Sequence, residues 1–532
     1  MPGRPTTLAT EGMVATPHYL ASVAGLEVLR SGGNALDAAI AANAVLAVVY
    51  PHMCAIGGDA FILLWDPAAS SLAAVNGSGR SAAAATIDAL RVAGWATMPE
   101  RGALTVTVPG AVDAWATALE RFGTRALGDL LQPAIHYAER GFPSSPGLSL
   151  SIAANRDLLA AREATARQFL PGGRVPQPGD LLVQPELARS LRLLAADGPA
   201  ALYGGALGEA VVAAVREEGG LLTLDDLRAH RSDWVQPLST TYRDVTLVEL
   251  PPNTQGVVAL EMANIVEGFD LSVWGHGSAE QVHHLVESKK LAFVDRARYI
   301  TDPDFAAIPL DRLTSKSYAA SLRRRIDPLR AATPATPTHG NGDTVALCVV
   351  DRDGLCVSLI QSIYSSFGSG LVADDTGIVL HNRGASFSLD PDDVNRLEPR
   401  KRPMHTLIPA MLLRDGLPWV VFGTMGAHGQ AQTHIQLLSA LVDCGLEPQE
   451  AVEFPRWYSG AARPGDPPDG LYVEPGFGPM VVAELRRLGH DVRVTDGPAS
   501  LMGHAQMIEV DRRRGILKGA ADPRSDGYAL GW

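Results

Sequence analysis

The sequence predicts a protein that mixes helices and strands, with a helix-rich front part and a strand-led rear part. Alanine-rich helical stretches occupy residues 16–50, whereas an alternating apolar pattern typical of strands begins at Thr344. Between the two parts, residues 329–343 (LRAATPATPTHGNGD) are rich in Thr, Pro, Ala and Gly and have almost no apolar periodicity. We therefore expect an exposed, mobile linker that ends at Asp343.

The front part combines helices with short strands. Ser31 to Asn34 separates two helices within residues 16–50, and Ser278 is the expected N-cap of a long helix that runs to about Tyr299. The other expected elements are strands at 61–65 and 104–109 and helices at 112–122, at 126–140 and within 185–230.

The rear part opens with a hairpin. Residues 344–351 and 355–360 read as two strands, and Arg352-Asp353-Gly354 reads as the tight turn between them. Further on, a strand at 419–422 leads through the glycine-rich GTMGAHG (423–429) into a helix that starts near Gln430. No internal repeat is present.

Composition excludes several classes of protein. The 532 residues carry a net charge of −13 with no basic block, which argues against nucleic acid as a partner. The widest apolar run, Ala38 to Val49, contains Asn43 and stops at Pro51, well short of the roughly 20 residues that cross a bilayer. We expect no membrane contact.

The N-terminus and the cysteines indicate a cytoplasmic protein. The first fifteen residues lack the apolar stretch of a secretory signal. No CxxC occurs, so the thiols are expected to be buried small hydrophobes in a reducing cytosol. The four cysteines are Cys54, Cys348, Cys356 and Cys444.

Standard phosphate, dinucleotide, metal and serine-hydrolase motifs are missing. The sequence has no GxxxxGK[ST], no GxGxxG after a strand, no HExxH, no paired-cysteine signature and no GxSxG elbow. His283 and His284 are adjacent on a helix, so they face different directions and cannot bind one metal together. We expect no metal and no cofactor.

The junction Asp343-Thr344 offers a different chemistry. If the bond before Thr344 breaks, the new α-amine lies beside its own hydroxyl. That amine has an unperturbed pKa near 8 and can act as the general base for the hydroxyl nucleophile. The alternative is structural, because threonine at the start of a strand is common in any sheet.

The flanking sequence resembles the γ-glutamyltransferase family of N-terminal nucleophile hydrolases over essentially the whole chain. Ten stretches match in family order: GGNALDAAIAA (32–42), IGGDAF (56–61), VPGAVDAW (108–115), PAIHYAERGFP (133–143), ELPPNTQG (249–256), HHLVESKKLAFVDRARYITDP (283–303), GDTVALCVVDRDG (342–354), FGSG (367–370), KRPMHTLIPA (401–410) and ADPRSDGYALGW (521–532).

The resemblance implies an α+β fold, a four-layer αββα sandwich, made as a precursor that cuts itself between Asp343 and Thr344. Residues 1–343 would form the large subunit and residues 344–532 the small one. The two fragments would stay associated, and the processed protein could form a homodimer. The family's chemistry needs no cofactor.

The resemblance also assigns catalytic roles. Thr344 would be the nucleophile and Ser362 the second hydroxyl beside it. The backbone N–H groups of Gly426 and Ala427 would form the oxyanion hole, where Ala427 stands in place of the family's glycine. Structurally, the same stretch is a glycine-rich turn before a helix, and both interpretations can hold.

The residues expected to bind substrate depart from the family pattern. Ser78 takes the place of the arginine that binds the substrate α-carboxylate, and Arg80 lies two residues away. Arg383 adds a positive charge suited to a carboxylate, although it could equally pin its own loop. The remaining departures are His405 and Thr406 in place of paired serines, Ser386 in place of the aspartate that holds the glutamyl ammonium, and Tyr364 in place of Asn or Glu.

These departures predict an amidohydrolase close to the family's acylase-like branch, which includes cephalosporin or glutaryl acylases and an oxamate amidohydrolase. The substrate would be an amide of a small acid, and Arg383, His405, Thr406 and Arg80 would hold its carboxylate. The segment between Ser388 and Lys401 is shorter than in transpeptidases with a lid loop, which favours hydrolysis over transpeptidation.

Two alternatives stay open. One is a true glutathione-type γ-glutamyltransferase, with glutathione metabolism as its role, whose amino-group site is rebuilt from Asp374, Asp375 or Asp390. The other is an inactive binding or scaffold protein that keeps the fold without processing.

Overall fold

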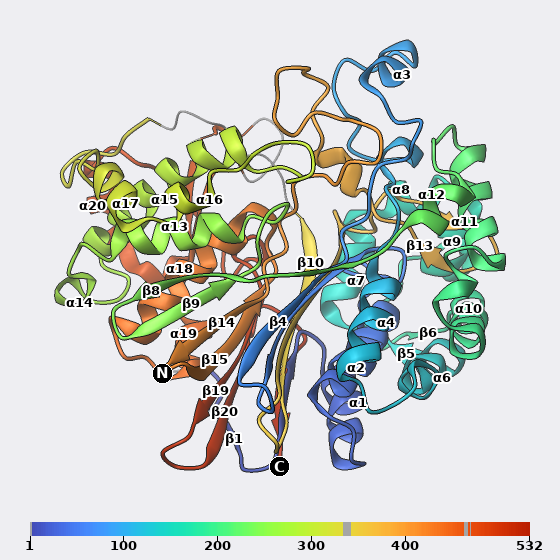
Figure 1. The fold of residues 1–532 in the computed structure, drawn as a ribbon, viewed down its shortest axis with the longest axis horizontal. Coiled ribbons are helices and arrows are strands. Elements are labelled where there is room, and N and C mark those ends of the chain that lie inside the picture. The colour runs from blue at the N-terminus through green and yellow to red at the C-terminus, as the bar shows by residue number, and fades with distance from the viewer. Residues whose placement is uncertain (1–2, 334–341, 462–465, 469) are drawn as a thin grey trace.

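Two seven-stranded antiparallel sheets pack face to face at the centre of the chain, and helices cover both outer faces (Figure 1). This computed structural model describes residues 3–333, 342–461, 466–468 and 470–532. The result is the αββα sandwich, as expected, with Thr344 at the start of a central strand.

The sheet that contains Thr344, called the Thr344 sheet below, has the order β21 (Tyr528–Gly531), β2 (Met13–Thr16), β10 (Asp343–Val350), β11 (Cys356–Tyr364), β3 (Asp59–Asp66), β4 (Ser71–Asn76), β7 (Asp233–Val235). The second sheet has the order β1 (Thr7–Ala9), β20 (Ile516–Ala521), β19 (Ala505–Asp511), β15 (Leu417–Thr424), β14 (Ala410–Arg414), β9 (Val245–Glu249), β8 (Leu238–Tyr242). Smaller sheets pair β5 (Phe142–Pro143) with β6 (Leu181–Leu182), β12 (Val372–Ala373) with β13 (Ile378–Val379), and β16 (Trp457–Ser459) with β17 (Gly470–Val473) and β18 (Asp491–Val494).

The helices divide by sheet. On the side of the Thr344 sheet lie α1 (Tyr19–Arg30), α2 (Ala35–Val49), α3 (Ile87–Val92), α4 (Ala111–Phe122), α5 (Leu127–Leu130), α6 (Gln132–Arg140), α7 (Pro146–Ala154), α8 (Arg156–Ala160), α9 (Glu163–Phe169), α10 (Pro185–Asp197), α11 (Ala206–Glu217) and α12 (Leu224–Ala229). On the side of the second sheet lie α13 (Gly256–Val266), α14 (Leu271–Trp274), α15 (Ala279–Tyr299), α16 (Leu310–Leu313), α17 (Lys316–Arg323), α18 (Gln430–Val442), α19 (Pro448–Glu453) and α20 (Gly478–Arg487).

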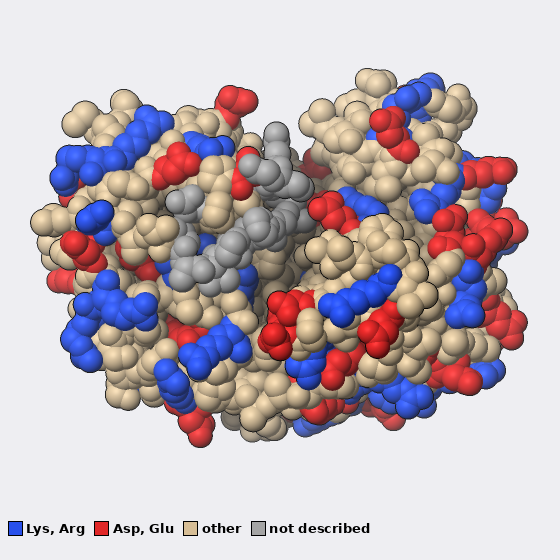
Figure 2. Space-filling view, turned by 90° about the horizontal axis from the view of Figure 1, so that it is seen from above, with Lys and Arg blue, Asp and Glu red and all other residues tan. Residues whose placement is uncertain are grey.

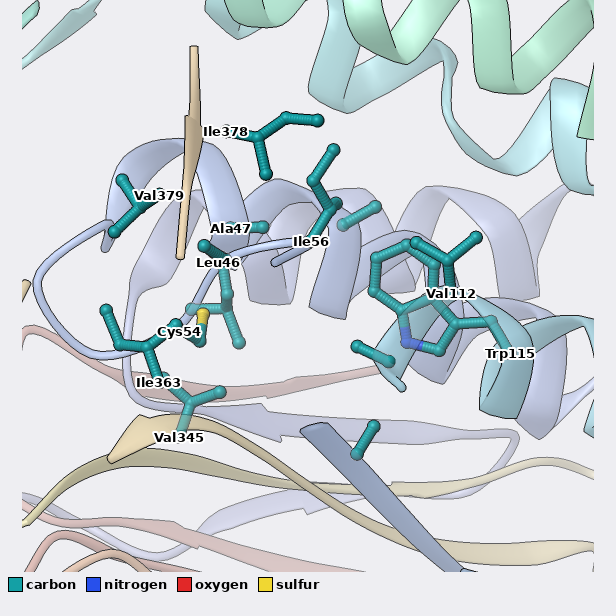
Figure 3. Packing of buried hydrophobic residues seen from close by; sticks show 14 of the residues in the cluster. Leu46, Ala47, Cys54, Ile56, Val112, Trp115, Val345, Ile363, Ile378 and Val379 are labelled. Atoms are coloured by element: carbon teal, nitrogen blue, oxygen red, sulfur yellow. The ribbon is translucent and has the colours of Figure 1, made fainter. Parts of the chain in front are cut away.

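Strand β10 is buried on both faces. Ala346, Cys348 and Val350 belong to the core between the sheets, whereas Val345, Leu347 and Val349 belong to the core beneath the helices. Alternate side chains of a strand point to opposite faces, so a strand covered on both sides is apolar throughout. Figure 3 shows Val345 and Ile363 packed below Leu46 and Cys54 of the helical layer.

Helix α2 is buried along its whole length, and Asn43, the polar residue within its apolar run, has a hydrogen-bond partner for both its amide groups. Asn43 donates from Nδ2 to Gln361 Oε1 of β11 (2.8 Å) and accepts at Oδ1 from Trp115 Nε1 of α4 (2.8 Å). Gln361 Nε2 in turn donates to the carbonyl of Ala55 (2.8 Å). A buried polar network is tolerated only when its groups are paired, so Asn43 ties two helices to the strand beside β10.

Most expected elements are confirmed. Helices α1, α2, α4 and α15, with Ser278 as N-cap, and strands β3, β10, β11 and β15 lie where the patterns placed them. The strand at 104–109 is wrong: Ala103–Thr105 form a 3-10 turn, and Val108 makes one backbone bond to Arg80 in place of a ladder. The helix at 126–140 is split into α5 and α6, because Pro133 near the start of α6 cannot donate to the preceding turn.

The linker expectation is met in part. Residues 329–333 are largely exposed, yet Ala332 is held at both backbone groups, by Glu287 Oε2 (3.1 Å) and Lys290 Nζ (2.6 Å) of α15. At the other end Gly342 is buried. Residues 334–341 lie outside the described residues.

Three expectations from composition can be compared with the structure: a surface without a basic block, buried cysteines and no membrane-spanning helix. Figure 2 shows Lys and Arg interspersed with Asp and Glu over the face it presents. Three cysteines are buried, but Cys444 is only half-buried. Within the described residues no single helix is long and apolar enough to span a membrane, while one bent pair, Pro185–Ala201 with Ala206–Glu217, meets that test by length and composition alone.

We predict that Asn43→Ala destabilises the fold by about 2–4 kcal/mol, because Gln361 and Trp115 each lose a buried partner. Urea denaturation of the uncut Thr344→Ala chain measures the change in unfolding free energy. Ser31→Ala, at the exposed end of α1, is the control and should shift the free energy by less than about 0.5 kcal/mol. A similarly small shift for Asn43→Ala would contradict a structural role for the network.

Candidate active site

The hydroxyl groups of Thr344 and Ser362 form a chain of hydrogen bonds that reaches the carbonyl before Thr344. The two residues are direct partners in the β10–β11 pairing, and the register shifts between Asp343 and Thr344. Thr344 Oγ1 donates to Ser362 Oγ (3.2 Å), and Ser362 Oγ donates to the carbonyl oxygen of Asp343 (2.6 Å). The same serine therefore contacts both the predicted nucleophile and the carbonyl that it would attack.

The backbone around this pair is closely packed. A Cβ at Gly58 would lie 2.3 Å from the carbonyl oxygen of Ser362, so only glycine lets β3 approach β11 here. Tyr364 N donates to Ser362 Oγ (2.8 Å) and Tyr364 has φ +76°, a region that non-glycine residues seldom adopt. The serine hydroxyl is thereby fixed in direction by three hydrogen bonds.

The loop Gly426-Ala427 lies directly against the residue that precedes Asp343. Ala427 has φ +46° and Gly426 φ +129°, so the alanine adopts the left-handed conformation that the glycine of relatives would take more easily. Its carbonyl accepts from Gln255 Nε2 (2.9 Å), and a Cβ at Gly342 would meet Ala427 Cβ at 2.6 Å. Among the described residues neither N–H of this pair is bonded to an acceptor, as an oxyanion hole requires.

Arg383 is a buried cation without an acidic partner among the described residues. Its side chain is 1% exposed, its guanidinium lies over the Tyr364 ring (4.1 Å to the centroid), and Nη1 donates to Thr406 Oγ1 (3.4 Å). Nη2 has no hydrogen-bond partner in the described structure. Burial lowers the pKa of Arg383 to about 10, so the group is still charged near neutral pH.

A carboxylate with two histidines lies next to this cluster and was not predicted. Asp59, opposite Ser362 in the β3–β11 pairing, accepts from His405 Nε2 (3.1 Å) and Gly79 N (3.1 Å), and His381 Nδ1 lies 3.5 Å away. Burial alone would raise the pKa of Asp59, but the two imidazoles outweigh it and hold that pKa far below its usual range.

His405 takes part in this cluster as a neutral ring. Burial, with Arg383 nearby, lowers the pKa of His405 to about 3. Its Nδ1 accepts from Leu407 N (3.3 Å), so the proton lies on Nε2, which faces Asp59. The sequence carried one signal for Asp59: it is an acidic residue that follows two glycines and begins an apolar strand.

Gln255 joins the separate parts of the site. Its Nε2 donates to the carbonyls of Thr406 (3.0 Å) and Ala427, and its Oε1 accepts from Arg296 Nη1 (2.9 Å). Arg296, also unpredicted, contacts His428 Nδ1 (2.9 Å) as well. One side chain thereby fixes both the predicted substrate side and the oxyanion loop.

Arg80 and Ser386 both have partners within the protein. Arg80 forms ion pairs with Asp302 and Asp304 (3.3 Å each), so its charge is already balanced. Ser386 Oγ donates to the carbonyls of Arg383 (2.9 Å) and Met404 (3.3 Å), which fixes the Arg383 loop. The roles of both residues toward substrate stay predictions.

The three aspartates proposed for a rebuilt ammonium site lie elsewhere. Asp374 and Asp375 line a surface depression with Arg167, and Asp375 pairs with that arginine (3.5 Å). Asp390 is exposed and caps the backbone of Asp392 (3.0 Å). Among the described residues, Asp59 is near enough to Arg383 for its charge to act on the guanidinium, although no ion pair joins the two.

Among the residues that the structure describes, one group of side chains is close enough to bind a metal ion: His283, Glu287 and His490. His283 Nδ1 is hydrogen-bonded to His490 Nε2 (2.8 Å), and its Nε2 to the carbonyl of Asp327 (2.8 Å). Glu287 pairs with Lys290 (2.6 Å) and accepts from Ala332 N. These contacts already use the ligand atoms, and they connect α15 to residues 327–332.

Comparison with known proteins identifies the family. The family model for gamma-glutamyltranspeptidase matches residues 21–532. The chain belongs to the gamma-glutamyltranspeptidase family. It is an enzyme of the N-terminal nucleophile type, an amidohydrolase that processes itself from a precursor.

Relatives match along their whole length. The glutathione hydrolase-like YwrD proenzyme of Bacillus subtilis is 44% identical, and the oxamate amidohydrolase proenzyme of Klebsiella pneumoniae is 41% identical, each over 99% of both chains. The crystal structure of the cephalosporin acylase from Bacillus halodurans superimposes with a TM-score of 0.93 at 39% identity, over 99% of this chain and 97% of that one.

We predict that Ser362→Ala slows self-cleavage on the order of 100-fold, because the Asp343 carbonyl and the Thr344 hydroxyl both lose their hydrogen-bond partner. Intact mass under denaturing conditions, followed over time, measures the conversion of the 532-residue chain into two fragments. Ser362→Thr, which retains the hydroxyl, should cleave within about tenfold of the wild type, and Thr344→Ala should not cleave. Equal rates for Ser362→Ala and the wild type would exclude this role of the serine.

Proposed function

We propose that the chain cuts itself between Asp343 and Thr344 and then hydrolyses an amide whose acyl half carries a carboxylate and no α-ammonium. The buried guanidinium of Arg383 carries this proposal. It lies over Tyr364, two residues beyond Ser362, with Nη2 unpaired among the described residues. A buried charge is stable only when it is paired, and a carboxylate is the partner that matches the guanidinium fork.

Self-cleavage follows from the hydroxyl chain. Thr344 Oγ attacks the Asp343 carbonyl carbon while its proton passes to Ser362 Oγ and the Ser362 proton moves to the carbonyl oxygen. The C–N bond then breaks as that proton returns through Ser362 to the Thr344 nitrogen, which leaves as a neutral amine with Asp343 held as an ester on Thr344 Oγ. Water hydrolyses that ester and frees both the Asp343 carboxylate and the Thr344 hydroxyl.

Substrate hydrolysis reuses the same atoms. The free α-amine of Thr344 takes the Oγ proton as Oγ attacks the substrate carbonyl, and the N–H groups of Gly426 and Ala427 stabilise the oxyanion. The amine passes the proton to the leaving nitrogen, and water then hydrolyses the acyl ester. Arg383 and Thr406 hold the substrate carboxylate, while His405 and Asp59 position that side of the site.

An ammonium on the acyl half fits this site poorly. Arg383 repels it, Ser386 supplies no charge, and the carboxylate of Asp59 is already bonded to His405 and Gly79 N. Relatives named for acylase and oxamate amidohydrolase activities agree with this preference. A cytoplasmic location and a homodimer stay predictions from the sequence and the family.

We predict that Arg383→Gln lowers kcat/KM for glutaryl-p-nitroanilide at least about 30-fold, or about 2 kcal/mol, because the substrate carboxylate loses its buried partner. Butyryl-p-nitroanilide, which has no such carboxylate, is the control and should lose less than about threefold. Equal losses on both substrates would show that Arg383 only supports its loop.

The substrate preference of the wild-type enzyme distinguishes the proposed acidic amide from a γ-glutamyl amide. γ-Glutamyl-p-nitroanilide differs from the glutaryl compound only by the α-amino group, so we expect it to react at least about tenfold more slowly in kcat/KM. Faster hydrolysis of the γ-glutamyl compound would overturn the proposal in favour of a glutathione-type enzyme. An uncut wild-type chain would favour an inactive protein.

A further inference from the structure

A cavity of about 540 Å³ opens beside the bond that self-cleavage breaks, and it is separate from the Arg383 cluster. Gly342, Asp343 and Gly426 are among the residues that line it, whereas Arg383, Tyr364 and Thr406 do not. Because Thr344 follows Asp343 directly, the cavity borders the place where the nucleophile and its amine act.

The cavity extends to the β21 side of Thr344, and it also reaches the end of β11 through Ser366, His52 and Met53. Along the Thr344 sheet, β2 and β21 lie on one side of β10, and β11 and β3 lie on the other. The cavity is lined by Ser525 and Asp526, which lead into β21. Arg383 lies over Tyr364 at the end of β11. An amide centred on Thr344 thus has a separate place for each half, the cavity for one and Arg383 for the other.

The lining is suited to an organic group with both apolar surface and hydrogen-bonding atoms. Met53, Leu150 and Leu501 supply apolar area. His52 and His504 are 2% and 3% exposed, and among the described residues His52 Nδ1 and both ring nitrogens of His504 have no hydrogen-bond partner. The two imidazoles thus add polar rings to the wall of the cavity.

The charge of the cavity does not favour a second carboxylate. Burial lowers the pKa of His52 to about 3 and that of His504 to about 4, so both rings are neutral at pH 7 and can donate or accept. Arg524, the cation in the lining, is paired with Glu474 and with Asp522 (3.1 Å). Asp343 and Asp526 also line the cavity, so the lining disfavours an anion and suits a polar group without negative charge.

We propose that this cavity binds the amine half of the substrate, so that the enzyme prefers amides of sizeable, neutral organic amines over primary amides that release ammonia. This inference rests on the proposed function and adds the class of leaving group. As the acyl carbon bonds to Thr344 Oγ and its bond to nitrogen breaks, the nitrogen takes the proton held by the Thr344 amine. The neutral amine then leaves through the cavity.

A bulky side chain at the cavity mouth tests the inference. Ala154, exposed at the end of α7, lines the cavity, and its neighbour Ala153 is exposed on the same helix and does not. Ala154→Trp is expected to lower kcat/KM for glutaryl-p-nitroanilide at least about tenfold more than for glutaramate, which releases only ammonia. Ala153→Trp is expected to leave both values within about twofold of the wild type. Each variant is compared with the wild type on the same substrate, which cancels the different reactivity of the two leaving groups.

A second variant tests the imidazoles. His52→Phe keeps a ring against Tyr50 and removes the ring nitrogens, and it is expected to lower kcat/KM for the anilide several-fold more than for glutaramate. Equal losses on the two substrates, or no loss for Ala154→Trp, would overturn the inference and leave the proposed function intact. A wild type that cleaves itself but hydrolyses neither glutaryl compound would overturn the proposed function, and this inference with it.

Discussion

The antiparallel pairing of β10 with β11 is the constraint on which the site depends. It places Thr344 opposite Ser362 and introduces the register shift at the Asp343-Thr344 bond. The two neighbouring strands then position the rest: Tyr364 at the end of β11 supports Arg383, and Asp59 at the start of β3 faces Ser362. Both faces of β10 are buried. A register slip of one residue would turn each of its side chains from one core to the other, which is strongly disfavoured.

Two buried arginines, Arg296 and Arg383, differ in the hydrogen-bond partners that the protein supplies for their guanidinium groups. Arg296 lies over the Phe293 ring, and its Nη1 contacts Gln255 Oε1 and His428 Nδ1, so neutral groups of the protein hold this guanidinium. Arg383 has a comparable aromatic neighbour, yet its Nη2 is unpaired among the described residues. Desolvating a guanidinium without an anion is unfavourable. This difference supports the proposal that Arg383 binds the substrate carboxylate.

The precursor segment is fixed at both described ends. Helix α15 binds residues 327–332 through His283, Glu287 and Lys290, which follow one another at helical spacing on one face. At the other end, Gly342 packs against Ala427 and Asp343 accepts from Ser362. The chain that must present its own carbonyl to Thr344 is thus held by contacts that are independent of the substrate side.

The sequence by itself determined the features that depend on local apolar pattern, helix caps and one short turn. The pattern predicted the hairpin around Arg352-Asp353-Gly354, in whose register Thr344 meets Ser362, the residue that the family resemblance indicated. It also predicted Ser278 as the residue that caps the start of α15. Only the tertiary structure decided which charged groups are free, since that depends on contacts between residues hundreds of positions apart. It paired Arg80 with Asp302, joined Asp59 to His405, and left Arg383 unpaired. No periodicity encodes such contacts, because each arises where separate loops meet at the same end of one sheet.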